Sequence, residues 1–246
     1  MKLRTCVYID GFNLYYRCLK DTPYKWLDLY RMAELLLPAD RHEITKVKFF
    51  TARIDARSND PDAPRRQEVY LRALSAYRPQ VEIVFGHFLS HAAMRPYAPP
   101  ATGWAKVTLT EEKGTDVNLA VHLLNDAWLD SYDCAVVVSN DSDLAEAMRL
   151  AKERNKLIGW MVTGKQHPSQ VLAKIAHFRK PIRETLLSVS QLPTLFPALP
   201  LQSRPPGKSA SARGCSYPRG RASRTGGRGR LRAIQARGDS PMFLLK

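Results

Sequence analysis

In the stretch Val136-Val-Val-Ser-Asn-Asp-Ser-Asp-Leu144, a run of β-branched residues gives way to small polar residues and two carboxylates. A helical pattern follows at once, from Ala145 to Arg154. This order is typical of a buried parallel strand that leads into a helix, and such folds keep their functional groups at the carboxyl ends of the strands. Two further stretches have the same character, Val7-Tyr-Ile-Asp-Gly-Phe-Asn13 and Lys113-Gly-Thr-Asp-Val117.

Apolar periodicity along the chain predicts alternating strands and helices. Strands are expected at 5–9, 46–54, 81–89, 104–111, 134–138 and 156–162, and helices at 26–37, 65–77, 116–129, 144–154 and 169–176. In the helix at 116–129 the apolar residues repeat every three or four positions: Val117, Ala120, Val121, Leu124 and Trp128. The three prolines within 91–103 indicate a surface loop. The alternation predicts an α/β domain with a mostly parallel sheet and helices on both faces.

The 246 residues divide by composition into a domain, 1–186, and a low-complexity tail, 187–246. The formal net charge is +15, of which +10 lies in 203–246, a stretch with eleven basic residues and one acid. The tail lacks apolar periodicity and is rich in Pro, Arg, Gly and Ser, which predicts disorder.

Two interpretations of the tail remain open. Arg219-Gly-Arg221 and Gly226-Gly-Arg-Gly-Arg230 resemble RGG segments, which bind RNA with little sequence preference. A reading-frame shift in a GC-rich gene would produce the same composition. Translation of the other frames separates the two, because a familiar domain end in another frame would contradict an RNA-binding tail.

Composition also limits the class of protein. No apolar run approaches the roughly 20 residues that span a bilayer, and residues 1–6 lack the pattern of a signal peptide. We therefore expect a cytoplasmic protein without a membrane partner. The four cysteines, Cys6, Cys18, Cys134 and Cys215, form no CxxC pair, which argues against a zinc site or a disulfide framework.

The acidic residues at the predicted strand ends indicate a metal site. Asp10 follows the first strand, Asp141 and Asp143 follow the strand at 134–138, and Asp116 opens a helix. If these strands are neighbours, the carboxylates converge and need a cation, for which oxygen ligands favour Mg²⁺ or Mn²⁺. Such a site activates water for attack on a phosphodiester.

Each acid also has a structural interpretation. Thr115 or Asp116 would cap a helix, the pair Asp10-Gly11 would form a turn, and Asp143 with Glu146 fits a capping box. Because Asp143 already supplies a cap in this interpretation, Asp141 is the stronger functional candidate.

The three acidic stretches together resemble the conserved segments of the NYN domain family, a branch of PIN-like nucleases that includes the bacterial LabA-like proteins. The resemblance covers about residues 3–180 and implies a three-layer α/β/α, PIN-like (Rossmann-like) fold and metal-dependent RNA cleavage. It implies Asp10, Asp116 and Asp141 as metal ligands, Asp143 as a further acid, and two polar partners, Asn13 and Ser139. Asn140 stands where the family usually has Gly, a mild departure because Asn tolerates unusual backbone angles.

Basic residues near these acids are candidate phosphate contacts. Lys113 stands closest in sequence to a predicted metal ligand, and Arg53 opens a cluster that continues with Arg57, Arg65 and Arg66. A solvated basic surface explains the cluster equally well.

The sequence therefore supports two main hypotheses. The first is an endoribonuclease that uses Mg²⁺ or Mn²⁺, and the second is a PIN-like module that binds RNA or protein and cuts nothing. A phosphohydrolase for small phosphate esters is a weaker third, and Phe12 argues against its haloacid-dehalogenase form, which needs Asp there. We expect RNA as a partner, and the sequence also allows a homodimer.

Overall fold

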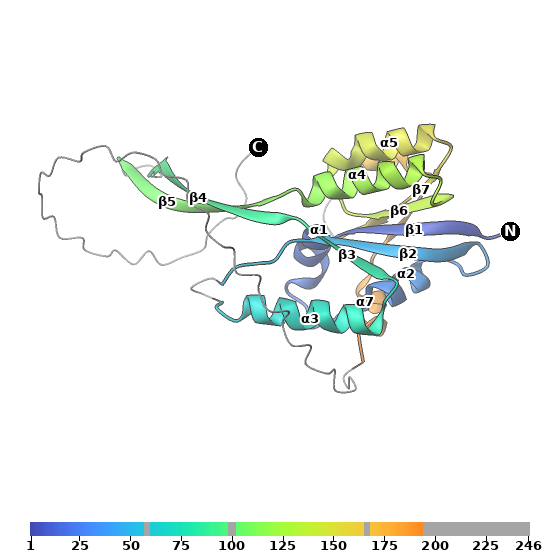
Figure 1. Ribbon diagram of the computed structural model, residues 1–246, viewed down its shortest axis with the longest axis horizontal. Helices are drawn as coiled ribbons and strands as arrows, with labels where there is room; N and C mark the ends of the chain where they lie inside the picture. Colours follow the sequence, from blue (N-terminus) through green and yellow to red (C-terminus); the bar gives the residue numbers. More distant parts are fainter. Residues whose placement is uncertain (57–59, 98–101, 165–167, 194–246) are drawn as a thin grey trace, which may run out of the picture. The chain divides into compact units, whose positions relative to one another are not determined.

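A single parallel sheet organises the domain in this computed structural model, which describes residues 1–56, 60–97, 102–164 and 168–193. The six strands lie in the order β3-β2-β1-β6-β7-β8, and every neighbouring pair is parallel (Figure 1). Their bounds are β1 Leu3–Asp10, β2 His42–Thr51, β3 Val81–Phe85, β6 Cys134–Val138, β7 Leu157–Val162 and β8 Phe178–Pro181. The predicted α/β fold is confirmed.

Alternating side chains of the central strands build two hydrophobic cores, one on each face of the sheet. In β1, Val7 and Ile9 join one core, while Cys6 and Tyr8 join the other. Strand β6 divides in the same way and is buried along its whole length. Burial on both faces is the reason that these strands consist almost entirely of apolar residues.

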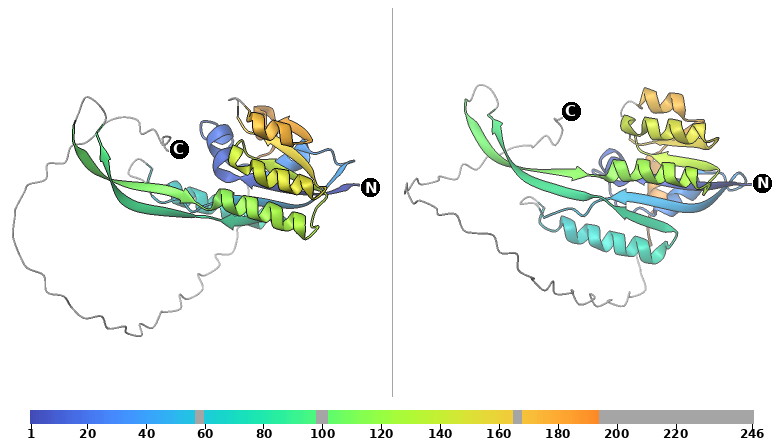
Figure 2. Two further views of the ribbon diagram at one scale, coloured as in Figure 1. Left: turned by 90° about the horizontal axis from the view of Figure 1, so that it is seen from above. Right: turned by 45° about the horizontal axis from the view of Figure 1, so that its top comes forward.

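Helices cover both faces of the sheet and complete three layers (Figure 2). One face carries α1 Gly11–Leu14, the π-helical turn η1 Tyr15–Leu19, α2 Leu29–Leu36, α3 Ala63–Tyr77 and α7 Glu184–Val189. The other face carries α4 Thr115–Trp128, the 3₁₀ turn η2 Ser142–Leu144, α5 Ala145–Glu153 and α6 Gln170–Ile175.

Helix α4 turns a different face to the sheet from the one its apolar repeat suggests. Leu119, Leu123 and Ala127 are buried in the core, whereas Val117 and Trp128 are 64% and 70% exposed. The helix was predicted correctly, but most of the apolar residues that predict it face outward.

The first part of the segment expected to be a loop at 91–103 belongs to a strand, which includes residues 91–96. β4 His87–Pro96 pairs with β5 Trp104–Lys113 over ten residues to form an antiparallel hairpin. The hairpin extends away from the six-stranded sheet (Figure 1). Pro96 is the last residue of its strand, where a missing backbone N–H is tolerated, so this proline does not prevent pairing.

Ordered structure continues past residue 186. Helix α7 reaches Val189, and Leu187 and Leu192 are buried in the core formed with α2 and α3. Of the two compact units in the chain, 1–199 and 200–246, the second lies outside the described residues, as does the predicted tail from 194 onward.

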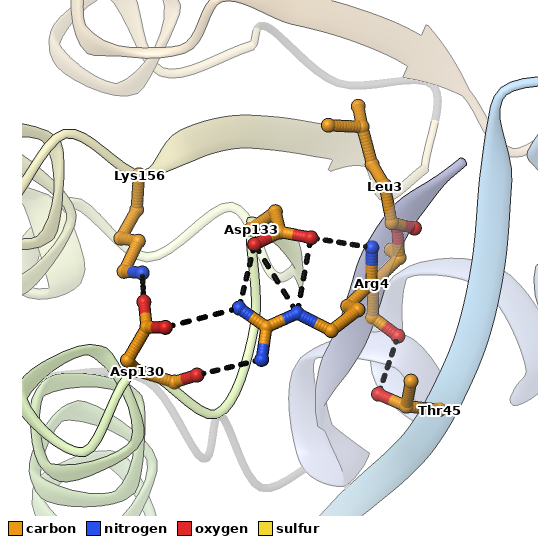
Figure 3. Close-up of polar contacts among 7 residues, drawn as sticks. Leu3, Arg4, Thr45, Asp130, Asp133 and Lys156 are labelled. Atoms are coloured by element: carbon orange, nitrogen blue, oxygen red, sulfur yellow. Dashed lines mark hydrogen bonds and ion pairs between the residues drawn. The ribbon is translucent and has the colours of Figure 1, made fainter. Parts of the chain in front are cut away.

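The amino ends of β1 and β6 are joined by ion pairs (Figure 3). The Arg4 guanidinium donates to both carboxylate oxygens of Asp133, with the shortest contact at 2.7 Å, and also to Asp130. Asp130 in turn pairs with Lys156. The hydrogen bonds from Arg4 lower the pKa of Asp133, and those from Lys156 and Arg4 lower the pKa of Asp130.

Candidate active site

Polar side chains gather where the central strands end. Asp10 is the last residue of β1, Ser139 follows β6, and Thr163 follows β7. These strands are adjacent and parallel, so their carboxyl ends lie along one edge of the sheet. Strands β1 and β6 are direct neighbours, so the acidic stretches that follow them lie next to each other at this edge.

The Asp10 carboxylate is buried, with 4% of the residue exposed. One oxygen accepts a 2.9 Å hydrogen bond from the backbone N–H of Asn13 and so caps α1. The other accepts a 2.9 Å hydrogen bond from the Ser139 hydroxyl. Asp10 thus combines a structural role at a helix start with a fixed position at the strand edge.

Asn13 connects three strand ends. Its side-chain oxygen accepts hydrogen bonds from the Asn140 backbone N–H at 3.1 Å and from the Thr163 hydroxyl at 2.6 Å. The Asn140 side-chain oxygen accepts from the Ser169 backbone N–H. One network therefore ties the loops after β1, β6 and β7 together.

Asp141, and not Asp143, supplies the side-chain cap after β6. Asp141 supplies the cap of η2, because its carboxylate accepts from the Asp143 backbone N–H at 3.0 Å. The predicted capping box is wrong, since Leu144 stands at the N-cap of α5 and Glu146 pairs with Arg149 instead. Asp141 remains beside Asp10, because its own backbone N–H donates to the Ser139 hydroxyl that Asp10 also contacts.

Asp116 lies in the first turn of α4, behind Gly114. Gly114 is the N-cap and has a φ of 88°, a left-handed conformation that favours glycine. Because Gly114 is the N-cap, neither Thr115 nor Asp116 occupies the N-cap position that the structural interpretation gave them. The first turn of α4 points toward the same end of the sheet as the carboxyl end of β1 (Figure 1).

The oxygen ligands near Asp10 suit a hard cation. Within the described ranges, no group of three or more His, Cys, Asp and Glu residues is arranged to hold a metal ion. Mg²⁺, however, commonly uses only one or two carboxylates, with water and substrate phosphate as its other ligands. Asp10 and Asp141 offer this simpler donor set, because the Ser139 hydroxyl bonds the Asp10 carboxylate and the Asp141 backbone N–H and so brings the two residues together.

A cavity of about 390 Å³ lies at the root of the hairpin. Its lining consists of Arg53, Asp55, Phe85, Gly86, His87 and Phe88. The Arg53 guanidinium lies 5.0 Å from the centre of the Phe85 ring, and Phe88 meets Phe12 edge to face at 5.8 Å. Lys113 pairs with His87 in the hairpin, next to this cavity.

The aromatic lining was missed from the sequence. Phe85 and Phe88 belong to the segment expected to be one continuous strand, 81–89, which the structure divides at Gly86. The turn-forming glycine between two aromatic residues was the available signal.

Arg17 is a second residue that sequence reasoning missed. Its Nε donates to the Thr163 carbonyl oxygen at 3.1 Å, which places the guanidinium at the carboxyl end of β7. One terminal guanidinium nitrogen is buried and has no hydrogen-bond partner in the part of the chain that the structure describes. The nearby Cys18 does not supply a nucleophile at neutral pH, because burial raises the pKa of its thiol.

The domain has six parallel strands between two layers of helices, and a network of carboxylate and amide groups lies at the carboxyl ends of the strands. This arrangement is a PIN-like α/β/α fold. The NYN domain family model matches residues 4–182, and the chain belongs to this family. None of the described helices is both long and apolar enough to cross a membrane.

Two individual proteins are similar to this chain. The 6-hydroxy-3-succinoylpyridine 3-monooxygenase HspA of Pseudomonas putida is 34% identical over 226 residues, covering 79% of this chain and 72% of that protein. A crystal structure of a protein of unknown function from Vibrio parahaemolyticus is 22% identical, with a TM-score of 0.46, and the match covers 74% of this chain and 94% of that chain.

Proposed function

We propose that this protein is an endoribonuclease that uses Mg²⁺ or Mn²⁺ to hydrolyse phosphodiester bonds. The observation that carries the proposal is the buried Asp10 carboxylate at the carboxyl edge of a PIN-like sheet, bonded to the Ser139 hydroxyl that also accepts from the Asp141 backbone N–H. Membership of a family with a nuclease-like fold supports the same reaction class.

In this proposal Asp10 and Asp141 would hold the cation, which lowers the pKa of bound water and neutralises charge on the phosphate when bound. Asn13 would fix the loops after β1, β6 and β7 relative to one another through its hydrogen bonds, so that the acids keep their positions. Lys113 and Arg53, both exposed, would contact the phosphates of the RNA. RNA would thus cross the edge of the sheet near the root of the hairpin.

Cleavage of a labelled single-stranded RNA in Mg²⁺ or Mn²⁺ tests the acids. Asp141→Asn is expected to reduce the rate by at least about 10²-fold, as removal of a group that stabilises transition-state charge does. Asp143→Asn is expected to cost much less, because its side chain is exposed and only its backbone N–H joins the network. Circular dichroism confirms that each variant is folded.

The outcomes separate hydrolysis from simple binding. Full cleavage by Asp141→Asn, or no cleavage by the wild type with any divalent metal, would contradict the nuclease. RNA binding that persists in EDTA without product would instead support a non-catalytic PIN-like module.

A second candidate is oxidation of a small aromatic acid, which the named activity of the Pseudomonas putida relative favours. The cavity at the hairpin root has the chemistry for such a substrate. Phe85 and Phe88 offer flat apolar surfaces, and Arg53 offers a cation for a carboxylate. A monooxygenase inserts one atom of O₂ and reduces the other to water, so a reductant such as a reduced nicotinamide is also required.

Oxygen uptake distinguishes the two reactions. The full chain is mixed with 6-hydroxy-3-succinoylpyridine and reduced nicotinamide, with and without added flavin, and O₂ consumption is followed. The nuclease proposal predicts no substrate-dependent uptake. Uptake that Arg53→Gln abolishes and Asp141→Asn leaves intact would favour the oxidation reaction.

A further inference from the structure

We propose that the cavity at the root of the hairpin binds an unpaired nucleobase of RNA, an inference that rests on the proposed nuclease function and names a feature of its substrate. The cavity has a volume of about 390 Å³, which is in the usual range for sites that bind small molecules. Proteins bind single-stranded RNA by placing unstacked bases against aromatic rings and arginine guanidinium planes. The lining of this cavity contains both kinds of group.

Phe85 and Arg53 supply the surface on which a base would stack. Phe85 is 41% exposed, although a phenylalanine ring is apolar over its whole surface. The Arg53 guanidinium lies 5.0 Å from the centre of that ring, and Arg53 is exposed as well. A flat apolar surface for a base therefore lies next to a cation for a phosphate, which is the combination that proteins use on single-stranded nucleic acid.

Asp55 favours a nucleobase over a small aromatic acid as the occupant. This exposed residue belongs to the same lining. Its carboxylate repels the carboxylate of an acid, but it accepts hydrogen bonds from the N–H groups on the edge of a base. Arg53 is compatible with either ligand, so Asp55 is the residue that distinguishes them.

The cavity lies close enough to the candidate active site for one RNA strand to reach both. The sheet pairs Asp10 with Phe50 of β2. The next residue of β2, Thr51, pairs with Phe85 of β3. Adjacent strands are about 4.8 Å apart, so the backbones at Asp10 and Phe85 are separated by roughly 10 Å. Phe12, two residues after Asp10, also packs against Phe88 of the cavity lining.

This arrangement gives the cavity a role in choosing the substrate. A phosphate at Asp10 and a base in the cavity would belong to the same stretch of RNA. Bases in a duplex are paired and stacked on one another, so they are not free to enter the cavity. The proposed subsite therefore selects RNA that is single-stranded beside the phosphate at the acids.

RNA binding measured without metal tests the subsite. Fluorescence anisotropy of a short labelled single-stranded RNA is followed in EDTA, so the readout does not depend on cleavage. Phe85→Leu keeps an apolar side chain but removes the ring, and it is expected to weaken binding by about 5-fold or more. Tyr77→Leu is the matched control, because Tyr77 is 44% exposed but ends α3 at the amino edge of the sheet, and it is expected to bind like the wild type.

Two further ligands show whether the loss comes from a base. The first is an oligomer of the same length with tetrahydrofuran spacers in place of its bases, and the second is duplex RNA. Wild type and Phe85→Leu are expected to bind each of these equally, because neither ligand offers a free base to the ring. Circular dichroism confirms that Phe85→Leu and Tyr77→Leu are folded.

The outcomes separate this inference from the nuclease itself. Equal binding of the single strand by wild type and Phe85→Leu, no binding by either, or the same loss on the oligomer without bases would overturn the subsite. Binding of 6-hydroxy-3-succinoylpyridine that depends on Phe85, together with RNA binding that does not, would overturn it in favour of an aromatic acid. RNA binding that depends on Phe85 supports the subsite even if no metal produces cleavage, a result that would contradict only the nuclease.

Discussion

Ser139 is the residue through which the two acids of the candidate site meet. Its hydroxyl donates to Asp10 and accepts from the Asp141 backbone N–H, and its carbonyl oxygen accepts from the Trp160 indole at 2.6 Å. The residue is fully buried. A small hydroxyl is therefore required here by local geometry, apart from any part in substrate binding.

Substitution of Ser139 tests this role. Ser139→Ala leaves the Asp10 oxygen and the Asp141 N–H without their shared partner, and we expect a loss of about 1–3 kcal/mol in the free energy of unfolding. Ser142→Ala, which removes an exposed hydroxyl from the next turn, is the control and should change stability by less than about 0.5 kcal/mol. Urea denaturation measures both, and equal midpoints for the two variants would show that the shared hydroxyl contributes little.

Close packing at the end of β1 leaves no room for a side chain at Gly11. A Cβ at this position would lie 2.7 Å from the Phe50 carbonyl oxygen and 2.8 Å from the Phe49 ring. The close approach of α1 to β2 therefore requires glycine directly after Asp10. The Asp-Gly pair is thus more than a turn, because it lets the first helix start against the neighbouring strand.

At the scale of elements, a buried polar cluster decides how α4 packs. Asp126 accepts hydrogen bonds from Lys48 of β2 at 2.6 Å and from the Tyr8 hydroxyl of β1 at 2.7 Å, and Lys48 also contacts His122. Burial, together with this contact to Asp126, raises the pKa of Tyr8. Buried ion pairs add little net stability, but an unpaired buried charge is costly. Only the orientation of α4 that pairs Asp126 satisfies Lys48, so Val117 and Trp128 face outward.

The ion pairs at the amino ends of β1 and β6 predict a dependence of stability on pH. Arg4 lowers the pKa of Asp133 in the folded state below its unfolded value, so this pair stabilises the fold above about pH 4. The contribution is lost as pH falls through the folded pKa, because the unfolded chain then binds more protons. Thermal unfolding midpoints should therefore fall less steeply on acidification in Asp133→Asn than in the wild type.

A matched variant isolates that pair. Asp40 is an exposed carboxylate 3.9 Å from Arg41, and screening by solvent leaves such a contact weak. Asp40→Asn is expected to keep the acid dependence of the wild type. If Asp133→Asn and Asp40→Asn show the same profile, the Arg4 pair does not contribute to acid stability.

At the scale of the whole molecule, three surfaces have different chemistry. The carboxyl edge of the sheet carries the acidic network and, at the hairpin root, the cavity with Arg53. The amino edge is closed by the ion pairs of Arg4. The outward side of α4 exposes the apolar side chains of Val117, Val121 and Trp128.

Charge is distributed unevenly along the whole chain. Residues 1–202 carry 27 basic and 22 acidic residues, a net charge of +5, while 203–246 carry +10. In the proposed nuclease, the attraction of the domain for RNA would therefore depend on the local position of Lys113 and Arg53 more than on its net charge. The exposed position of these two residues agrees with such a role.

The sequence by itself determined most of the strands and helices around the three acidic stretches and the parallel character of the sheet. These predictions use apolar runs, glycines at turns and the residues around each acid, all of which are close together in the chain. Such patterns predict local structure, including the strand ends that carry Asp10 and Asp141.

Only the tertiary structure decided which side chains meet. The role of Asp141 as a cap depends on backbone angles at one turn. The shared hydroxyl of Ser139 and the orientation of α4 depend on contacts between residues far apart in the sequence. Periodicity records which residues share a face of a helix but not which face the sheet covers. Lys48 and Asp126, 78 positions apart, settle that choice, because a buried charge must find its partner.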